Sequence, residues 1–211
     1  MILVLYDSKA SKQLDAAVLK TGIREVLLMM RAASSIFNIV ENLPKVNRVI
    51  SIAGPGSNGG DAYGVAILSA IAGKKTKIYS ISEASGESKK ISDFCCALGV
   101  EKLHSLPEPS EISRNDVIID GLFGSGLNRP PTGHYLDAIT WINVSRRNGA
   151  KVIAIDVPSG LSASNGSTPG VAVKADFTVM CLSSKQGCYT DKAPELCGKV
   201  LFANLGIEKP E

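Results

Sequence analysis

The sequence predicts an α/β fold in which a mostly parallel, doubly wound sheet lies between helices. Short apolar runs rich in β-branched residues alternate with helix-like segments along most of the chain. These runs are apolar at successive positions, which is typical of strands buried on both faces. The 211 residues contain no repeat, low-complexity segment or linker-like stretch. We therefore expect residues 1–211 to form a single domain.

The N-terminal part of the chain is expected to be helical. Apolar residues recur at helical spacing over residues 14–23 and again over 27–40, before Pro44 ends the pattern. From there strands and helices alternate. Strands are expected at 48–53, 76–81, 116–119, 151–155 and 177–181, with a weaker candidate at 200–203, and helices at 61–72, 87–98 and 134–147.

Composition indicates a globular protein without a nucleic-acid or membrane partner. The chain is 45% hydrophobic and 20% charged, and its formal net charge is +3. This charge is too small, and the Lys and Arg residues are too scattered, to indicate a nucleic-acid surface. The apolar run over residues 1–5 is too short for a signal peptide or a membrane span.

The cysteine pattern favours reduced thiols. The chain has five cysteines with no C-x-x-C pair, and two histidines. This pattern indicates neither a disulfide framework nor a zinc site. Because reduced thiols are typical of the cytoplasm, we expect a cytoplasmic location.

Three segments that directly follow expected strands carry the residues of chemical interest. In a doubly wound sheet, ligands bind in the crevice beyond the carboxyl ends of the strands. The three segments are GPGSNGGD at 54–61, DGLFGSGLNR at 120–129 and DVPSG at 156–160. We expect them to meet at one edge of the sheet.

The first segment contains a G-x-G-x-x-G pattern from Gly54 to Gly59. Its backbone N–H groups at a helix start could hold a phosphate, and a ligand-free strand-to-helix turn is the alternative. A dehydrogenase fits less well, because 53 residues precede the motif and Glu83 would have to serve as the ribose-binding acid. A Walker-type loop is excluded, because no Lys-Ser or Lys-Thr follows the glycines.

The other two segments each begin with an aspartate. Asp120 could coordinate a cation, cap a loop or act as a base, and a turn-forming role is the plain alternative. Arg129 could pair with a phosphate or lie solvated at the surface. Ser159 is expected to be structural, because neither histidine lies at a strand end to complete a triad.

Two carboxylates in one cleft repel each other, which indicates either a bound cation or a general acid and base. Asn58, Asp120 and Ser159 form an oxygen-rich set that suits a hard alkali or alkaline-earth cation.

Together the three segments resemble the NAD(P)H-hydrate epimerase family, also called the YjeF N-terminal-domain family. The similarity covers nearly the whole chain. It begins with QLD at 13–15 and LMMRAA at 28–33, runs through the three segments, and continues with ADFTV at 175–179, KQG at 185–187 and GKV at 198–200. The chain departs from the family pattern at Ser57, Ala62 and Ser162, where the family usually has Asn, Gly and an acidic residue.

The resemblance implies a Rossmann-like three-layer α/β/α sandwich and a non-redox isomerase. Its substrate would be hydrated NADH or NADPH (NADHX or NADPHX), whose R and S epimers the family interconverts. K⁺ would be held by Asn58, Asp120 and Ser159. The substrate would be bound by Ser57, Asn58, Gly59, Gly60 and Asp61, by Gly124, Ser125, Gly126, Leu127, Asn128, Arg129 and Pro130, and by Asp156, which would contact the reacting ring. The resemblance also implies a homodimer and an NAD(P)HX dehydratase as functional partner.

Our mechanistic hypothesis makes Asp156 the general acid and base at the hydrated carbon, with an iminium intermediate. Ring opening and reclosure is the competing route. Lys185 is expected to be a solvated loop lysine, and a place at the margin of the site, near phosphate, is the alternative. Two other functions stay open: a catalytically inactive dimerisation or scaffold module of the same family, and a nicotinamide-dependent oxidoreductase.

Overall fold

The computed structural model describes residues 4–126, 129–190 and 192–207. The strands and helices follow in the order β1 (Leu5–Tyr6), α1 (Ser8–Lys20), α2 (Glu25–Asn42), β2 (Arg48–Ala53), α3 (Ser57–Ile71), β3 (Lys75–Ser80), α4 (Glu87–Ala97), β4 (Glu101–Leu103), β5 (Asp116–Gly121), α5 (His134–Arg147), β6 (Lys151–Ile155), β7 (Phe177–Cys181), β8 (Ser184–Lys185), α6 (Ala193–Cys197) and β9 (Lys199–Ala203). Two 3₁₀ turns lie at Pro109–Glu111 and Gln186–Tyr189. Among these helices, none is long and apolar enough to cross a membrane.

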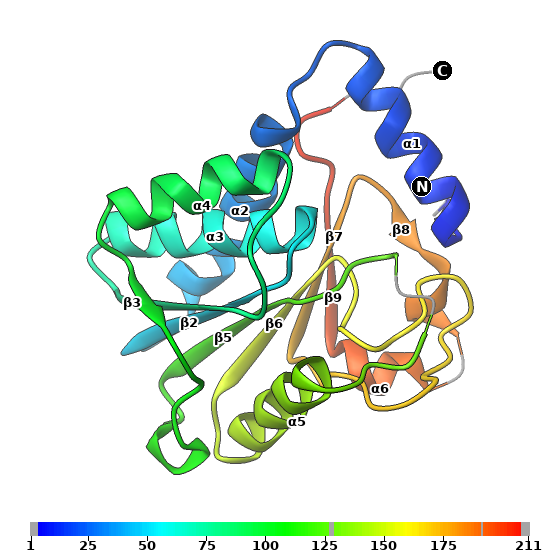
Figure 1. Cartoon of the computed structure of the whole chain (residues 1–211). Helices are drawn as coiled ribbons and strands as arrows, with labels where there is room; N and C mark the ends of the chain where they lie inside the picture. The colour runs from blue at the N-terminus through cyan, green and yellow to red at the C-terminus, as the bar shows by residue number, and fades with distance from the viewer. Residues whose placement is uncertain (1–3, 127–128, 191, 208–211) are drawn as a thin grey trace.

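A parallel sheet of seven strands forms the centre of the molecule, which confirms the predicted doubly wound arrangement (Figure 1). The strand order is β4-β3-β2-β5-β6-β7-β9, and every neighbouring pair is parallel. The order runs outward in opposite directions from β2 and β5. The carboxyl ends of these two strands are level, since Ala53 pairs with Gly121. Their ends therefore form the switch point where such sheets bind ligands.

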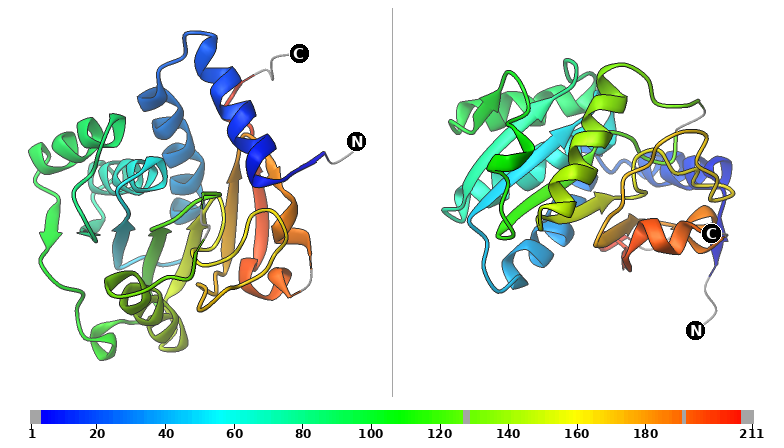
Figure 2. Two further views of the ribbon diagram at one scale, coloured as in Figure 1. Left: turned by 45° about the vertical axis from the view of Figure 1, so that its right-hand side comes forward. Right: turned by 90° about the horizontal axis from the view of Figure 1, so that it is seen from below.

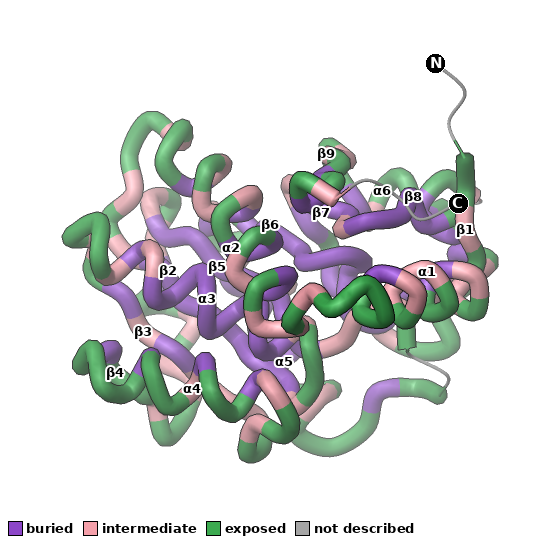
Figure 3. The backbone as a smooth tube through the Cα atoms, turned by 90° about the horizontal axis from the view of Figure 1, so that it is seen from above, coloured by how far each residue is buried: buried purple, intermediate pink, exposed green. Residues whose placement is uncertain are grey.

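Helices cover both faces of the sheet, so the three-layer sandwich is also confirmed. Helices α2, α3 and α4 lie on one face, and α5 and α6 lie on the other (Figures 1 and 2). Adjacent residues of β2 point to opposite cores: Val49 packs in the cluster under α2 and α3, and Ile50 packs in the cluster under α5. Both side chains are fully buried, which explains why the strands are apolar at successive positions. Figure 3 shows the central strands β5 and β6 as mostly buried.

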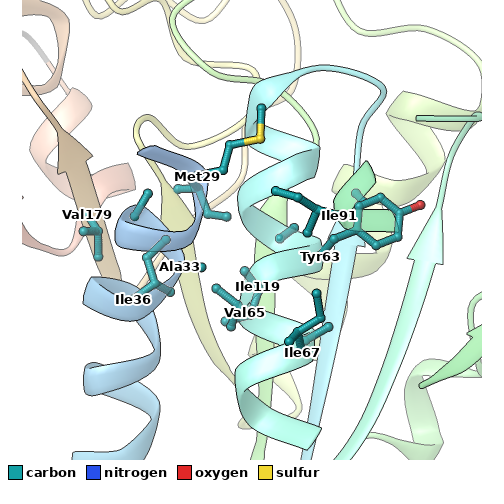
Figure 4. Packing of buried hydrophobic residues seen from close by; sticks show 14 of the residues in the cluster. Met29, Ala33, Ile36, Tyr63, Val65, Ile67, Ile91, Ile119 and Val179 are labelled. Carbon is teal, nitrogen blue, oxygen red and sulfur yellow. The ribbon is translucent and has the colours of Figure 1, made fainter. Parts of the chain in front are cut away.

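Helices α2 and α3 pack closely against each other above the sheet. Figure 4 shows Met29 and Ala33 of α2 on the side of that helix that faces α3. A Cβ added at Gly64 of α3 would lie 2.6 Å from the Ala33 Cβ. A glycine in this helix therefore allows the close approach of α2.

Most differences from the predicted elements lie at short or terminal segments. Helix α3 begins at Ser57 and not at 61, so it includes most of the first glycine segment. Strand β9 confirms the weaker candidate as the edge of the sheet. Strands β1 and β8 have two residues each and pair only with each other in the described chain, so no local pattern predicts them. The five-residue α6 and three-residue β4 are too short to produce a periodic pattern.

Candidate active site

A cavity of about 610 Å³ opens at the carboxyl ends of the central strands. The three predicted segments all contribute to its wall, as do α1, the start of α2 and the residues after β7. Of the predicted substrate-binding residues, those lining the cavity are Ser57, Asn58, Asp61, Gly124, Ser125, Gly126, Arg129, Pro130 and Asp156. Gly59 and Gly60 lie in the first turn of α3 behind this wall. Leu127 and Asn128 lie outside the described residues.

The glycines of the first segment allow three backbone segments to meet. A Cβ at Gly59 would lie 1.8 Å from the Gly54 carbonyl oxygen, and one at Gly54 would lie 2.1 Å from that of Leu122. The glycine pattern thus has a packing role at the switch point, whatever binds there. Ser57 begins α3, and its hydroxyl donates a hydrogen bond to the Glu25 carboxylate at 2.7 Å.

Asn58 joins the ends of three neighbouring strands. Its side-chain Nδ2 donates to the carbonyl of Phe123 at 2.8 Å and to that of Ile155 at 2.9 Å. Phe123 follows β5, Ile155 is the last residue of β6, and Asn58 lies after β2. One side chain therefore connects the carboxyl ends of β2, β5 and β6.

Asp120 and Ser159 form a second connection beneath the cavity. The Ser159 hydroxyl donates to Asp120 Oδ1 at 2.6 Å, and the Ser159 N–H donates to Oδ2 at 2.8 Å. The Phe123 N–H donates to the Ser159 hydroxyl oxygen at 3.0 Å. Ser159 therefore joins the loop that follows β6 to the segment that follows β5. The Asp120 carboxylate is fully buried.

The donor chemistry around Asp120 fits a hard cation, as oxygen ligands generally do. Burial raises the pKa of Asp120 to about 6, although the hydrogen bonds from Ser159 and Leu122 act in the opposite direction. No cationic side chain among the described residues forms an ion pair with Asp120. The same residues contain no group of three or more His, Cys, Asp or Glu side chains suited to a metal. A cation here would be held by amide, hydroxyl and carboxylate oxygens from Asn58, Ser159 and Asp120.

Asp156 follows β6 in an unusual backbone conformation. Its φ of 65° lies in the left-handed region, which is uncommon for residues other than glycine. The Asp156 N–H donates to the Val179 carbonyl at 2.8 Å, which holds this conformation against β7. The side chain lines the cavity, where its Oδ1 accepts a hydrogen bond of 3.3 Å from the Cys181 N–H.

The prediction for Lys185 was wrong, because its side chain is buried in the site. Only 2% of its surface is exposed, and its ammonium forms an ion pair with Asp156. Burial by itself lowers the pKa of Lys185, but the Asp156 carboxylate outweighs this effect and leaves the pKa raised. The strand-end rule could have found Lys185, because it follows the strand Phe177–Cys181 by four residues.

Two further carboxylates lie near this ion pair. Burial raises the pKa of Asp15 to about 6, and burial together with Asp156 and Glu25 raises that of Asp61 well above its ordinary value. Asp61 was predicted as a site residue and Asp15 was not. The signal for Asp15 is its place in α1, where it shares a face with the buried Ser11 and Val18.

An aromatic pair on the cavity wall was also missed. The rings of Phe123 and Tyr135 are stacked, with centroids 4.7 Å apart and an interplanar angle of 24°. Both residues line the cavity. They come from a loop and from α5, so no local sequence signal connects them.

The fold and the position of the cavity define a doubly wound α/β protein with its ligand site at the switch point. Residues 25–187 match the family model described as YjeF-related protein N-terminus. The chain belongs to this family.

Relatives of known name support the same assignment. The chain is 34% identical over 184 residues to the NAD(P)H-hydrate epimerase of Limosilactobacillus fermentum, with 87% of each chain covered. It is also 34% identical over 210 residues to the bifunctional NAD(P)H-hydrate repair enzyme Nnr of Coxiella burnetii. That match covers 98% of this chain and 42% of the Coxiella protein. The crystal structure of the yeast protein YNL200c shares the fold with a TM-score of 0.79 at 18% identity, covering 99% of this chain and 96% of that one.

Proposed function

We propose that this protein is an NAD(P)H-hydrate epimerase, an isomerase that interconverts the R and S epimers of NADHX and NADPHX. The observation that carries the proposal is the ion-paired Asp156 in a cavity at the switch point, next to two glycine-rich segments. Relatives named as epimerases match most of the chain, which supports the same activity.

The cavity offers different chemistry to the two ends of such a substrate. Backbone N–H groups at the start of α3 and the Arg129 guanidinium suit a diphosphate. The Asp156 carboxylate suits the end at which positive charge develops. We propose that residues 57–61 and 124–130 bind the nucleotide, and that Asp156 lies at the hydrated ring.

The reaction itself is a reversible loss and gain of water at one carbon. The C–O bond breaks as the ring nitrogen supplies its electron pair, and the departing oxygen takes a proton and leaves as water. The planar iminium cation then accepts water on either face and returns a proton. Asp156 exchanges this proton, and its negative charge stabilises the cation. Ring opening and reclosure remains the alternative route.

We also propose that K⁺ binds at Asn58, Asp120 and Ser159. The cation would neutralise the buried Asp120 carboxylate and order the loops that follow β2, β5 and β6. The oxygen donors at this point and the absence of an ion-pair partner for Asp120 within the described chain support this assignment.

A coupled assay tests the activity. Mixed NADHX epimers are given to an S-specific dehydratase until the S form is exhausted, and this protein is then added to the remaining R form. We expect NADH formation to resume, with a higher rate in KCl than in choline chloride. Failure of the folded wild-type protein to restart NADH formation would favour the scaffold function. Hydride transfer from intact NADH would favour an oxidoreductase.

The remaining expectations are proposals of the same kind. We propose a single domain over residues 1–211, a homodimer, a cytoplasmic location and a dehydratase as functional partner. The five free cysteines agree with a reducing compartment. The name of the Coxiella relative, a bifunctional repair enzyme, supports pairing with a second repair activity.

A further inference from the structure

Lys185 is the most deeply buried charged side chain at the cavity, and its surroundings explain how a cation is tolerated there. Its ammonium donates to the Cys181 carbonyl at 2.7 Å and forms the ion pair with Asp156. A buried ammonium without such partners would be strongly unfavourable. The side chain therefore has one defined position, with its charge directed at Asp156.

The two oxygens of the Asp156 carboxylate have different environments. Oδ1 contacts the Lys185 ammonium and accepts the Cys181 N–H. Among the described residues, the ion pair with Lys185 and the hydrogen bond from Cys181 both reach Oδ1, and Asp156 lines the cavity. One oxygen is thus occupied by the protein, and the other is available to a ligand.

The backbone holds both partners of the ion pair. Asp156 has a left-handed φ of 65°, a strained conformation that persists in a non-glycine residue only where its surroundings impose it. Lys185 lies in β8, which pairs in parallel with the N-terminal strand β1, with Tyr6 opposite Lys185. The Lys185 N–H also contacts the Met180 sulfur at 3.3 Å. Segments from both ends of the chain therefore determine where the ammonium lies.

We propose that Lys185 is a positioning residue for the epimerisation: it occupies Oδ1 of Asp156 and thereby directs Oδ2 at the hydrated carbon. The inference rests on the proposed function, because it assigns Asp156 the proton exchange of that reaction. Lys185 itself makes no bond to the substrate and changes no covalent bond. Its effect is to fix which oxygen of Asp156 gives and takes the proton.

The first test replaces the charge. Lys185→Met keeps the apolar stem and removes the ammonium, and Lys174→Met is the matched control because Lys174 is exposed. We expect Lys185→Met to lower kcat about 100-fold, the order of loss seen when a reacting group is misplaced by about 1 Å. We expect KM to change less than about 3-fold, because the nucleotide contacts remain. The control should retain wild-type kcat and KM.

The second test restores the charge without the covalent link. Lys185→Ala lacks the atoms that n-propylammonium would supply, and n-propanol is the neutral control of similar size. We expect propylammonium to raise kcat of Lys185→Ala at least about 10-fold and propanol to have no effect, because electrostatic positioning needs the charge. Equal recovery with both compounds would assign Lys185 to cavity filling and overturn the proposal.

The outcomes separate this inference from the proposed function. An inactive wild-type protein contradicts the epimerase function itself. An active wild-type protein with kcat of Lys185→Met within about 3-fold overturns the role of Lys185 alone. Circular dichroism reports whether Lys185→Met and Lys185→Ala fold. If neither folds, Lys185→Arg tests the role of Lys185, because it keeps the buried charge but displaces the donor atoms. For that variant we expect kcat to fall at least about 10-fold with little change in KM, and wild-type kcat would overturn the proposal.

Discussion

At the scale of single residues, the site depends on charges that the protein interior would otherwise disfavour. Asp156 is compensated by Lys185, and Asp120 is compensated only by hydrogen-bond donors among the described residues. The sequence placed both aspartates correctly at strand ends, because that position follows from the local pattern. It did not show which of the two had a cationic partner, because Lys185 lies 29 residues beyond Asp156.

Asp156 is expected to be essential for turnover. Asp156→Asn keeps the size of the side chain but cannot exchange a proton or stabilise a cation with its charge. We expect epimerisation to fall at least about 1,000-fold in the coupled assay. The circular dichroism spectrum should be unchanged, and retained turnover by the variant would contradict the role of Asp156.

Asp120 is expected to make stability depend on pH in buffer without K⁺. Its pKa is about 6 in the folded protein against 3.8 as the ordinary value, so the folded state binds the proton more tightly. The free energy of unfolding should therefore fall as the pH rises from about 4 to about 6. Urea titrations across this pH range should show a smaller fall in the free energy of unfolding for Asp120→Asn than for the wild-type protein. Some pH dependence should persist in that variant, because Asp15 has a raised pKa as well. If the free energy of unfolding changed with pH equally in the wild-type protein and in Asp120→Asn, the raised pKa of Asp120 would be contradicted.

Among the secondary-structure elements, the apolar strands have the strongest sequence signal and the two-residue strands have the weakest. Strands β2, β6 and β7 have the predicted bounds, since burial on both faces leaves a continuous apolar run. Strands β1 and β8 exist only because the chain brings residues 5 and 6 beside residues 184 and 185. Two residues without a periodic pattern cannot be predicted as a strand.

The packing of α2 on α3 should be sensitive to one added methyl group. Gly64→Ala places a Cβ at 2.6 Å from the Ala33 Cβ, and we expect a loss of about 1–3 kcal/mol in the free energy of unfolding. Gly56→Ala is the control, because a Cβ there meets no atom within 4 Å, and its loss should stay under about 1 kcal/mol. Ala33→Gly in the Gly64→Ala background should recover part of the stability. Equal losses at Gly64 and Gly56 would contradict the close approach of the helices.

The start of α1 should influence substrate affinity through the second glycine segment. The Ser8 hydroxyl donates to the Ser125 carbonyl at 2.6 Å, which ties α1 to a predicted substrate-binding loop. We expect Ser8→Ala to lower stability by about 1 kcal/mol and to raise KM more than it lowers kcat. Ser35→Ala is the control, since the Ser35 hydroxyl bonds only within α2. An unchanged KM for Ser8→Ala would show that this contact does not act on the substrate.

At the scale of the whole molecule, the site is a junction of strand ends. Asn58 after β2, Phe123 after β5 and Ile155 at the end of β6 meet through the Asn58 amide. A cation bound at Asn58, Asp120 and Ser159 would therefore hold three crossover connections at once. Binding of the proposed cation would therefore be coupled to global stability.

Potassium should accordingly raise the unfolding temperature. At tenfold excess over its dissociation constant, a ligand that binds only the folded state contributes about 1.4 kcal/mol. For a chain of this length, we expect a rise of about 3–6 °C in KCl relative to choline chloride at equal ionic strength. Differential scanning calorimetry measures this rise, and Asp120→Asn should abolish it. A wild-type protein that responds equally to the two salts would contradict the potassium site.

Local patterns in the sequence predicted the parallel sheet, its two covered faces and the clustering of Asn58, Asp61, Asp120 and Asp156 near the carboxyl ends of the strands. These features follow from local patterns, because burial on both faces imposes apolar runs and a sheet edge imposes glycines and polar residues after them. The contacts of the folded chain were needed to establish the ion pair of Lys185 with Asp156 and the pairing of β1 with β8. Each of these depends on contact between segments far apart in the chain. The free energy of a buried charge is set by such neighbours and not by the residues beside it in sequence.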